Sequence, residues 1–135
     1  MSQVIVSENG QGRYQQEIRA GRHHYLADEP ESMGGADAGP APFDLLLSAL
    51  GACTAMTLRM YAERKNLPLR SIRVELESGK VEIDGQPRDQ VHRRIQLEGE
   101  LTPEQRQRLL EIAQRCPIHR ALQQPLYLPA ELIGA

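Results

Sequence analysis

The chain has 135 residues, a formal net charge of −2 and a charged fraction of 25%, values that are ordinary for a single soluble globular domain spanning residues 1–135. No basic face stands out and aromatic residues make up only 4%, so the composition argues against a nucleic-acid partner. The first ten residues lack a basic start and a long apolar run, which predicts no signal peptide and a cytoplasmic protein.

The N-terminal part of the chain predicts three short strands in an antiparallel meander. Residues 4–6 are β-prone and precede Asn-Gly, a strong hairpin signal. Two further strands are expected over residues 14–19 and 23–27. Residues 28–41 are then too rich in acid, Gly and Pro for a strand or helix. A loop of that length in a small domain suggests a functional role, and the alternative is a solvated crossover.

Residues 42–66 predict a long helix that is apolar on every side. Pro42 suits the first helical position, and Asp44 suits the positive end of the helix dipole. The uncharged stretch between Asp44 and Arg59 is shorter than the ~20 residues of a membrane span, so we expect a buried core helix and no membrane contact. A rod of about 36 Å is longer than most small domains, and a helix without a polar face must be covered all round. We therefore expect a homodimer that buries it from both sides.

The middle of the chain predicts a hairpin. Apolar and charged residues alternate over residues 72–76 and 91–97, and Asp84-Gly85 marks a turn between the two strands. One face of this hairpin is therefore expected to be buried and the other solvated.

The C-terminal part predicts two helices and a strand. Residues 102–105 form a capping box with proline at the first helical position. Pro117 ends that helix and suits the start of a short second helix through residue 122, which leaves Cys116 at its N-cap. A closing edge strand is expected over residues 126–133. The whole order is βββ–α–ββ–α–α–β, an α+β fold.

Two cysteines carry the candidate chemistry. Cys116 is expected to face free N–H groups at a helix N-terminus, which favours its thiolate, and Arg115, His119 and Arg120 add positive charge. The alternative for Cys116 is a small hydrophobe at a helix junction. Cys53 lies in mid-helix without free backbone donors, and burial alone would raise its pKa. Taken alone, Cys53 is therefore interpreted as core packing.

The sequence leaves open whether the two cysteines meet, because they are far apart along the chain. In a reducing cytoplasm a disulfide between them would be transient and catalytic rather than structural. A zinc site is the competing use: Cys116-x-x-His119 together with Cys53 and either His23 or His24 would supply four ligands. That fragment is only half of the usual paired spacing, so we expect neither a metal nor a cofactor.

A family resemblance goes further than these spacings. The stretch GGADAGPAPFDLLLSALGACTAMTLRMYAERK, followed after two strands by CPIHRAL, resembles the family of osmotically inducible protein C and the organic hydroperoxide resistance proteins, especially its shorter OsmC-like members. The resemblance implies an intertwined homodimer with two long central helices and active sites at the subunit interface. It also implies a thiol peroxidase: Cys53 attacks an organic hydroperoxide, Cys116 resolves the sulfenic acid as a disulfide, and a dithiol regenerates both.

The family pattern also includes a carboxylate and an arginine that would activate Cys53, and the carboxylate position departs from that pattern here. In the hydroperoxide resistance branch, a glutamate after the helix-opening proline pairs with an arginine that holds the thiolate. Phe43 occupies that position here, and Asp44 is a step of about 100° further round the helix. The arginine falls near Arg13, with Arg19 or Arg22 as alternatives.

Two other functions remain open at this point. The missing glutamate is consistent with a non-enzymatic dimer that binds a small apolar ligand in the interfacial pocket. A thiol-dependent stress protein that acts on another electrophile is the third possibility.

Overall fold

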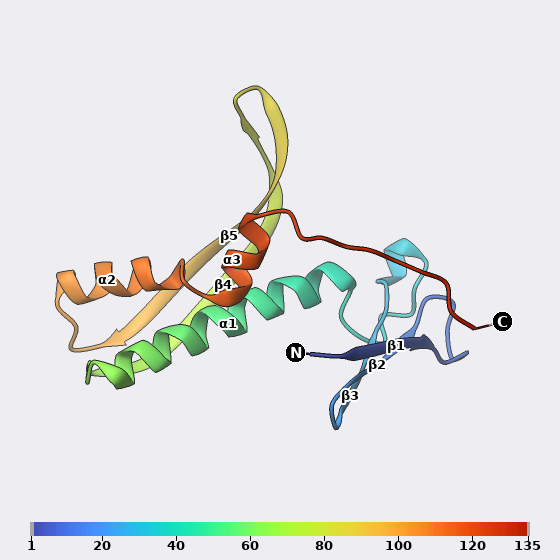
Figure 1. Cartoon of the computed structure of the whole chain (residues 1–135), viewed down its shortest axis with the longest axis horizontal. Coiled ribbons are helices and arrows are strands. Elements are labelled where there is room, and N and C mark those ends of the chain that lie inside the picture. The colour runs from blue at the N-terminus through green and yellow to red at the C-terminus, as the bar shows by residue number, and fades with distance from the viewer. Residues whose placement is uncertain (1, 135) are drawn as a thin grey trace. The chain divides into compact units, whose positions relative to one another are not determined.

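The computed structural model describes residues 2–134 and has an α+β fold (Figure 1). The predicted α+β class and the order βββ–α–ββ–α–α are confirmed. The elements are β1 (Val4–Glu8), β2 (Gln16–Ala20), β3 (His23–Ala27), the 3-10 turn η1 (Glu31–Met33), α1 (Pro42–Arg64), β4 (Leu69–Ile83), β5 (Gln86–Gly99), α2 (Pro103–Ala113) and α3 (Pro117–Gln123).

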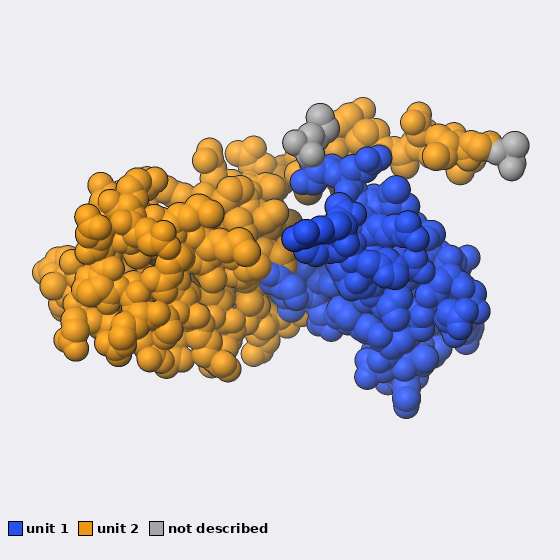
Figure 2. All heavy atoms as spheres, turned by 90° about the horizontal axis from the view of Figure 1, so that it is seen from below, with its two compact units in different colours: residues 1–48 blue, residues 49–135 orange. Residues whose placement is uncertain are grey.

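The chain divides into two compact units, Met1–Ser48 and Ala49–Ala135, which are coloured separately in Figure 2. The boundary falls within α1. The single domain expected from the sequence stays a prediction.

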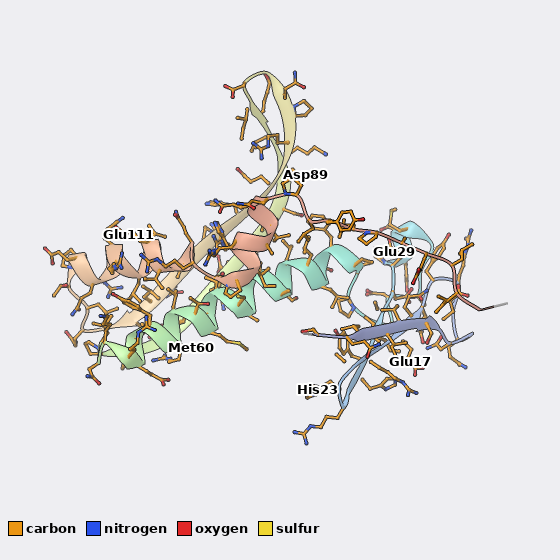
Figure 3. The ribbon with its side chains drawn as sticks, viewed as in Figure 1. Glu17, His23, Glu29, Met60, Asp89 and Glu111 are labelled. Atoms are coloured by element: carbon orange, nitrogen blue, oxygen red, sulfur yellow. The ribbon has the colours of Figure 1, made fainter. Side chains whose placement is uncertain are left out.

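The first unit contains a three-stranded antiparallel sheet in the order β1-β2-β3. Ile18 of β2 pairs with Val6 of β1 and with Tyr25 of β3, and it is buried. β2 and β3 are joined at Gly21, whose φ of 62° lies in the left-handed region that glycine adopts without strain. Figure 3 labels Glu17 and His23 of these strands. The predicted antiparallel meander is confirmed.

The loop after β3 is organised around the buried carboxylate of Asp28. Its side chain accepts hydrogen bonds from the backbone N–H groups of Glu29, Ala36 and Ala38, at 2.8, 3.2 and 3.1 Å. The hydrogen bond from Ala38 is the largest of the effects that lower the pKa of Asp28. The carboxylate thus adds to the backbone hydrogen bonds that the loop makes within itself, such as Asp28 N–H to the Pro40 carbonyl at 3.2 Å and Asp37 N–H to the Glu29 carbonyl at 3.1 Å.

The second unit is built around a stripe of α1. Its buried residues recur at helical spacing: Leu50, Thr54, Leu58 and Ala62, with Gly51 beside them. Leu58 is fully buried in a core with Leu109, Ile112 and Ala113 of α2, and apolar side chains of β4 and β5 pack against that core. A methyl group on Gly51 would lie 2.6 Å from Leu76 Cδ1, so this glycine allows β4 to approach the helix closely.

Local signals fix the ends of the helices as the sequence predicted. Asn66 follows α1 with a left-handed φ of 53°, and Leu67 N–H donates to the carbonyl of Ala62, as in a Schellman motif. Thr102 caps α2: its hydroxyl accepts from Gln105 N–H, and the Gln105 side chain accepts from Thr102 N–H. The predicted capping box is confirmed.

β4 and β5 pair in one long antiparallel hairpin, from Leu69 opposite Gly99 to Ile83 opposite Gln86. The turn predicted at Asp84-Gly85 is confirmed, and both residues have positive φ angles of 52° and 74°. Figure 3 labels Asp89 in the outer part of this hairpin, where its carboxylate pairs with Lys80 at 2.7 Å.

The closing strand predicted over residues 126–133 is wrong, because no described residue after α3 belongs to a strand. Pro125 and Pro129 remove two backbone donors from this segment. Within the described chain, no strand pairs with it. Its apolar side chains are mostly exposed, Leu128 at 79% and Ile133 at 87%. Alternating apolar residues alone predicted a strand, but a strand also requires a partner.

The long helix is covered on one side only. Met56 and Met60 are 60% and 66% exposed, and with Ala49 and Ala52 they form an apolar stripe away from the buried one; Met60 is labelled in Figure 3. By length and composition, α1 could also cross a membrane, with a mean hydropathy of 1.3 over its most apolar 18 residues. Core helices of soluble proteins have the same length and composition, and Leu58 of α1 is completely buried within the protein.

Candidate functional site

Cys116 lies at the N-cap of α3, as the sequence predicted. Pro117 occupies the first helical position, and Cys116 has an extended backbone with φ −54° and ψ 129°. Its sulfur accepts a hydrogen bond from His119 N–H at 3.4 Å, and the residue has no exposed surface. A free backbone donor of the helix is thus satisfied by sulfur, an arrangement that favours the thiolate.

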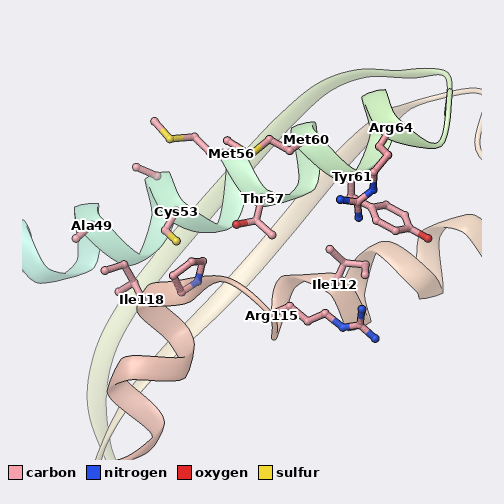
Figure 4. Close-up of a pocket in the computed structure, with 12 residues that line it drawn as sticks. Ala49, Cys53, Met56, Thr57, Met60, Tyr61, Arg64, Ile112, Arg115 and Ile118 are labelled. Carbon is pink, nitrogen blue, oxygen red and sulfur yellow. The ribbon is translucent and has the colours of Figure 1, made fainter. Parts of the chain in front are cut away.

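Cys53 comes from the middle of α1 and reaches the same place. Figure 4 shows it pointing toward Ile118 at the start of α3, with Thr57 one turn further along α1. Both cysteines are free thiols, and they lie close enough for each to shift the pKa of the other. The fold therefore brings together two thiols whose proximity the sequence left open.

The surroundings of the two thiols shift their pKa values in opposite directions. Burial raises the pKa of Cys53, and its hydrogen bond to Cys116 raises it further. Burial also acts to raise the pKa of Cys116, but hydrogen bonds from Cys53, from the N–H groups of His119 and Ile118, and from Thr54 outweigh it and lower that pKa. In this chain the pair therefore favours a proton on Cys53 and a thiolate on Cys116.

An apolar groove of about 600 Å³ opens beside Cys53, a volume in the range of small-molecule sites. One wall is α1, and Ile112, Pro117 and Ile118 line the other. The side chains of Arg64 and Arg115 lie away from Cys53, toward the opposite end of the groove (Figure 4). The groove thus combines an accessible thiol, an apolar lining and two cations.

Arg93 of β5 belongs to the site, although the sequence analysis did not single it out. Its guanidinium donates to Thr54 Oγ1 at 2.9 Å, to the Ala113 carbonyl at 3.3 Å, and to His119 Nδ1 at 2.7 Å. The signal was present in the sequence, since Arg93 shares an alternating strand face with Val91 and Ile95, where an apolar residue is expected.

The other predicted site residues lie in the first unit. Arg13 stacks over Tyr14, with its guanidinium carbon 4.9 Å from the ring centroid, and Arg19 pairs with Glu17 at 3.5 Å. Arg22 is exposed in the turn between β2 and β3, and Asp44 lies in the first turn of α1. Because both cysteines belong to the second unit, the roles of these four residues toward Cys53 stay predictions.

The zinc alternative finds no ligand set in the described part of the chain. Among residues 2–134, no group of three or more His, Cys, Asp or Glu side chains could hold a metal ion. His24 instead pairs with Glu17 at 2.8 Å, His23 is exposed on β3, and His119 Nδ1 accepts from Arg93.

Comparisons with known proteins are consistent with this arrangement. A family model described as OsmC-like protein matches residues 34–128. No curated protein matches the sequence.

Solved structures share the fold at low sequence identity. An OsmC-like protein from Mycoplasma pneumoniae aligns with a TM-score of 0.76 and 17% identity, covering 91% of this chain and 87% of that one. An organic hydroperoxide resistance protein from Legionella pneumophila aligns with a TM-score of 0.69 and 16% identity, covering 91% of this chain and 89% of that one. The organic hydroperoxide resistance protein OhrB of Bacillus subtilis aligns with a TM-score of 0.63 and 19% identity, covering 91% of this chain and 90% of that one.

Proposed function

Because the chain belongs to the OsmC-like protein family, we propose that it is a thiol-dependent peroxidase that reduces organic hydroperoxides with Cys53 and Cys116. The observation that carries the proposal is the pair of neighbouring free thiols, one of which opens onto an apolar groove. Several solved structures with this fold are named organic hydroperoxide resistance proteins. The function of this chain is thus inferred from the site together with the family.

The resting pair supports a defined sequence of steps. Cys53 passes its proton to the Cys116 thiolate as it attacks the outer oxygen of the hydroperoxide, and the O–O bond breaks. The alkoxide takes the proton back from Cys116, which yields an alcohol, a Cys53 sulfenic acid and a Cys116 thiolate. That thiolate attacks the Cys53 sulfur, forms the S–S bond and expels hydroxide. An external dithiol then reduces the disulfide.

The groove favours an organic peroxide over hydrogen peroxide. Its walls are mainly methyl, methylene and thioether groups, including Met56, Ile112 and Ile118. An alkyl or aryl group buried there would gain about 25 cal/mol for each Å² removed from water. Hydrogen peroxide has no such group and would bind only near the thiol.

The active form is proposed to be a cytoplasmic homodimer. The exposed apolar stripe of α1, which includes Met56 and Met60, supports a second copy that completes the wall of the groove. Arg13 or Arg19, and Asp44, remain the proposed activating groups for Cys53 in that assembly, in line with the family resemblance.

The test is to mix the reduced protein with cumene hydroperoxide and to follow free thiols and intact mass. One equivalent should remove two thiols and two mass units in the parent. Cys116→Ser should stop at a sulfenic acid that a dimedone-type reagent traps, and Cys53→Ser should react no faster than free cysteine. A Cys53→Ser variant as fast as the parent, or no Cys53–Cys116 disulfide, would show that the mechanism is wrong.

A second candidate function rests on the same groove. A non-enzymatic dimer that binds a small apolar ligand would use its volume and lining while the thiols stay incidental. A co-purified ligand, with peroxide reactivity no better than that of free cysteine, would favour it. A thiol protein that acts on another electrophile would instead consume that electrophile faster than cumene hydroperoxide in direct competition.

A further inference from the structure

Arg93 joins three elements directly around Cys116. It projects from β5 and makes one hydrogen bond to each neighbour: the Thr54 hydroxyl of α1, the Ala113 carbonyl at the end of α2, and the His119 ring of α3. The guanidinium has five donors in a fixed plane and cannot be deprotonated in proteins. It therefore places a permanent positive charge against Thr54 and His119, two residues that act on the buried Cys116.

The contact with His119 defines the state of that ring. Arginine can only donate, so Nδ1 of His119 must accept, and the ring is the neutral tautomer with its proton on Nε2. Nε2 is buried and has no hydrogen-bond partner among residues 2–134. Burial and the charge of Arg93 both lower the pKa of His119. The ring thus anchors α3 as a neutral group while the His119 backbone N–H donates to Cys116.

Thr54 connects the arginine to the sulfur. Its fully buried hydroxyl accepts from Arg93 at 2.9 Å and donates to the Leu50 carbonyl at 2.7 Å, and Thr54 is one of the groups that lower the pKa of Cys116. A neutral thiol is a weak acceptor and a thiolate a strong one. When Cys116 becomes a thiolate, the hydroxyl can turn toward it while the arginine holds the hydroxyl oxygen in place.

We propose that Arg93 is a positioning residue that acts through Thr54 to make Cys116 the leaving thiolate when the Cys53–Cys116 disulfide is reduced. This inference rests on the proposed function. In the step, a thiolate of an external dithiol attacks the Cys53 sulfur and forms a mixed disulfide, the S–S bond breaks, and its electron pair leaves on Cys116. The second thiol of the reductant then releases Cys53, so that the dithiol is oxidised and the protein disulfide is reduced.

Access and charge select the same direction of attack. Cys116 has no exposed surface, whereas Cys53 lines the groove, so a dithiol can reach only Cys53. The groups that act on the pKa of Cys116 include Cys53 and Thr54 from α1 and the backbone N–H of His119 from α3, and Arg93 from β5 reaches Cys116 indirectly, through its hydrogen bonds to Thr54 and His119. Arg93 is the permanent cation of this set, and a better-stabilised leaving thiolate departs faster.

The test compares variants that differ in one charge. In a Cys53→Ser background only Cys116 titrates as a thiol, and absorbance at 240 nm follows its ionisation. Arg93→Met should raise the midpoint by about one pH unit, a tenfold loss of thiolate at a fixed pH below both midpoints. Arg93→Lys should recover most of the shift. Arg94→Met is the matched control, because Arg94 is the next residue, is exposed, and pairs with Glu75 at 2.8 Å.

Variants of Thr54 provide a second test if the Arg93 variants do not fold. Thr54→Val removes the hydroxyl at equal size and should raise the same midpoint, whereas Thr54→Ser keeps it and should not. Any of three results would overturn the proposal. Arg93→Met could have the same midpoint as its background, or its shift could equal that of Arg94→Met. Thr54→Val could also have the same midpoint as Thr54→Ser.

The reduction step is measured separately from peroxide chemistry. In the two-cysteine protein the disulfide is made with diamide, and its reduction by dithiothreitol is followed. Arg93→Met should slow that reduction severalfold and Arg94→Met should not; an unchanged rate would overturn the proposal. A protein that fails to reduce hydroperoxides but shows these shifts would disprove the proposed function and leave the role of Arg93 intact.

Discussion

Asp28 shows how much order a single side chain can impose. Three backbone N–H groups converge on its carboxylate, and the chain between it and α1 has no regular secondary structure beyond one 3-10 turn. An amide at this position would present one oxygen in place of two and would add donors that face other donors.

We therefore expect Asp28→Asn to destabilise the protein at pH 7. The hydrogen bond from Ala38, the largest effect, lowers the pKa of Asp28, so the carboxylate stabilises the fold above the ordinary pKa of about 3.9. That stabilisation is lost as pH falls through the lowered pKa. Urea unfolding from pH 7 to pH 2.5 should show the parent converging on the variant. Glu31→Gln, at an exposed position of the same loop, should follow the parent throughout.

His119 makes stability fall with falling pH as well, but in a higher pH range. Burial, and then the charge of Arg93, lower its pKa in the folded protein, so the unfolded chain binds a proton near pH 6.5 while the folded chain does not. Stability should therefore fall as pH drops below about 6.5. The slope should end once pH passes below the lowered folded pKa. Urea unfolding between pH 7.5 and pH 5 should show this slope in the parent and a smaller slope in His119→Gln; equal slopes would contradict the assignment.

At the scale of single elements, the α2 cap is the simplest feature to test. The Thr102 hydroxyl accepts from Gln105 N–H at 3.1 Å, and removal of such a cap costs about 1 kcal/mol. Thr102→Ala should lower the free energy of unfolding by that amount in urea titrations, and Thr102→Ser should restore most of it. A loss equal in both variants would point to the lost methyl group rather than to the cap.

Elements with local signals could be predicted from the sequence, and those that depend on distant partners could not. Pro103 and Thr102 specify the start of α2, and Asp84-Gly85 specifies the hairpin turn, within a few residues of chain. The prediction of a strand near Leu128 was wrong because the alternating pattern contains no information about a neighbouring strand with which it could pair. The site behaves in the same way.

In the site, Cys116 was predicted at its helix end because Pro117 fixes that end locally. The approach of Cys53 and the inward direction of Arg93 depend on how α1, β5 and α3 pack, which no spacing along the chain encodes. An arginine at an apolar position of an alternating strand was the one readable hint.

At the scale of the whole molecule, the exposed stripe of α1 predicts association. Met60 is 66% exposed on an apolar helix, and a carboxylate there would be costly to bury against a second copy. Sedimentation equilibrium of the parent should give about twice 15.1 kDa, and Met60→Glu should shift the distribution toward monomer. Met33→Glu, at a methionine that is 64% exposed outside α1, should leave it unchanged. A monomeric parent would contradict the proposed homodimer.

The closeness of the two thiols also affects how readily excess peroxide would inactivate such an enzyme. A sulfenic acid is lost for good when a second peroxide oxidises it to sulfinic acid before a thiol condenses with it. Here the condensing Cys116 already lies close to Cys53, so we expect the disulfide to form without unfolding of α1 or α3. The buried Cys116 is itself shielded from oxidant. Turnover at high peroxide should therefore end in a reducible disulfide rather than in a dead enzyme.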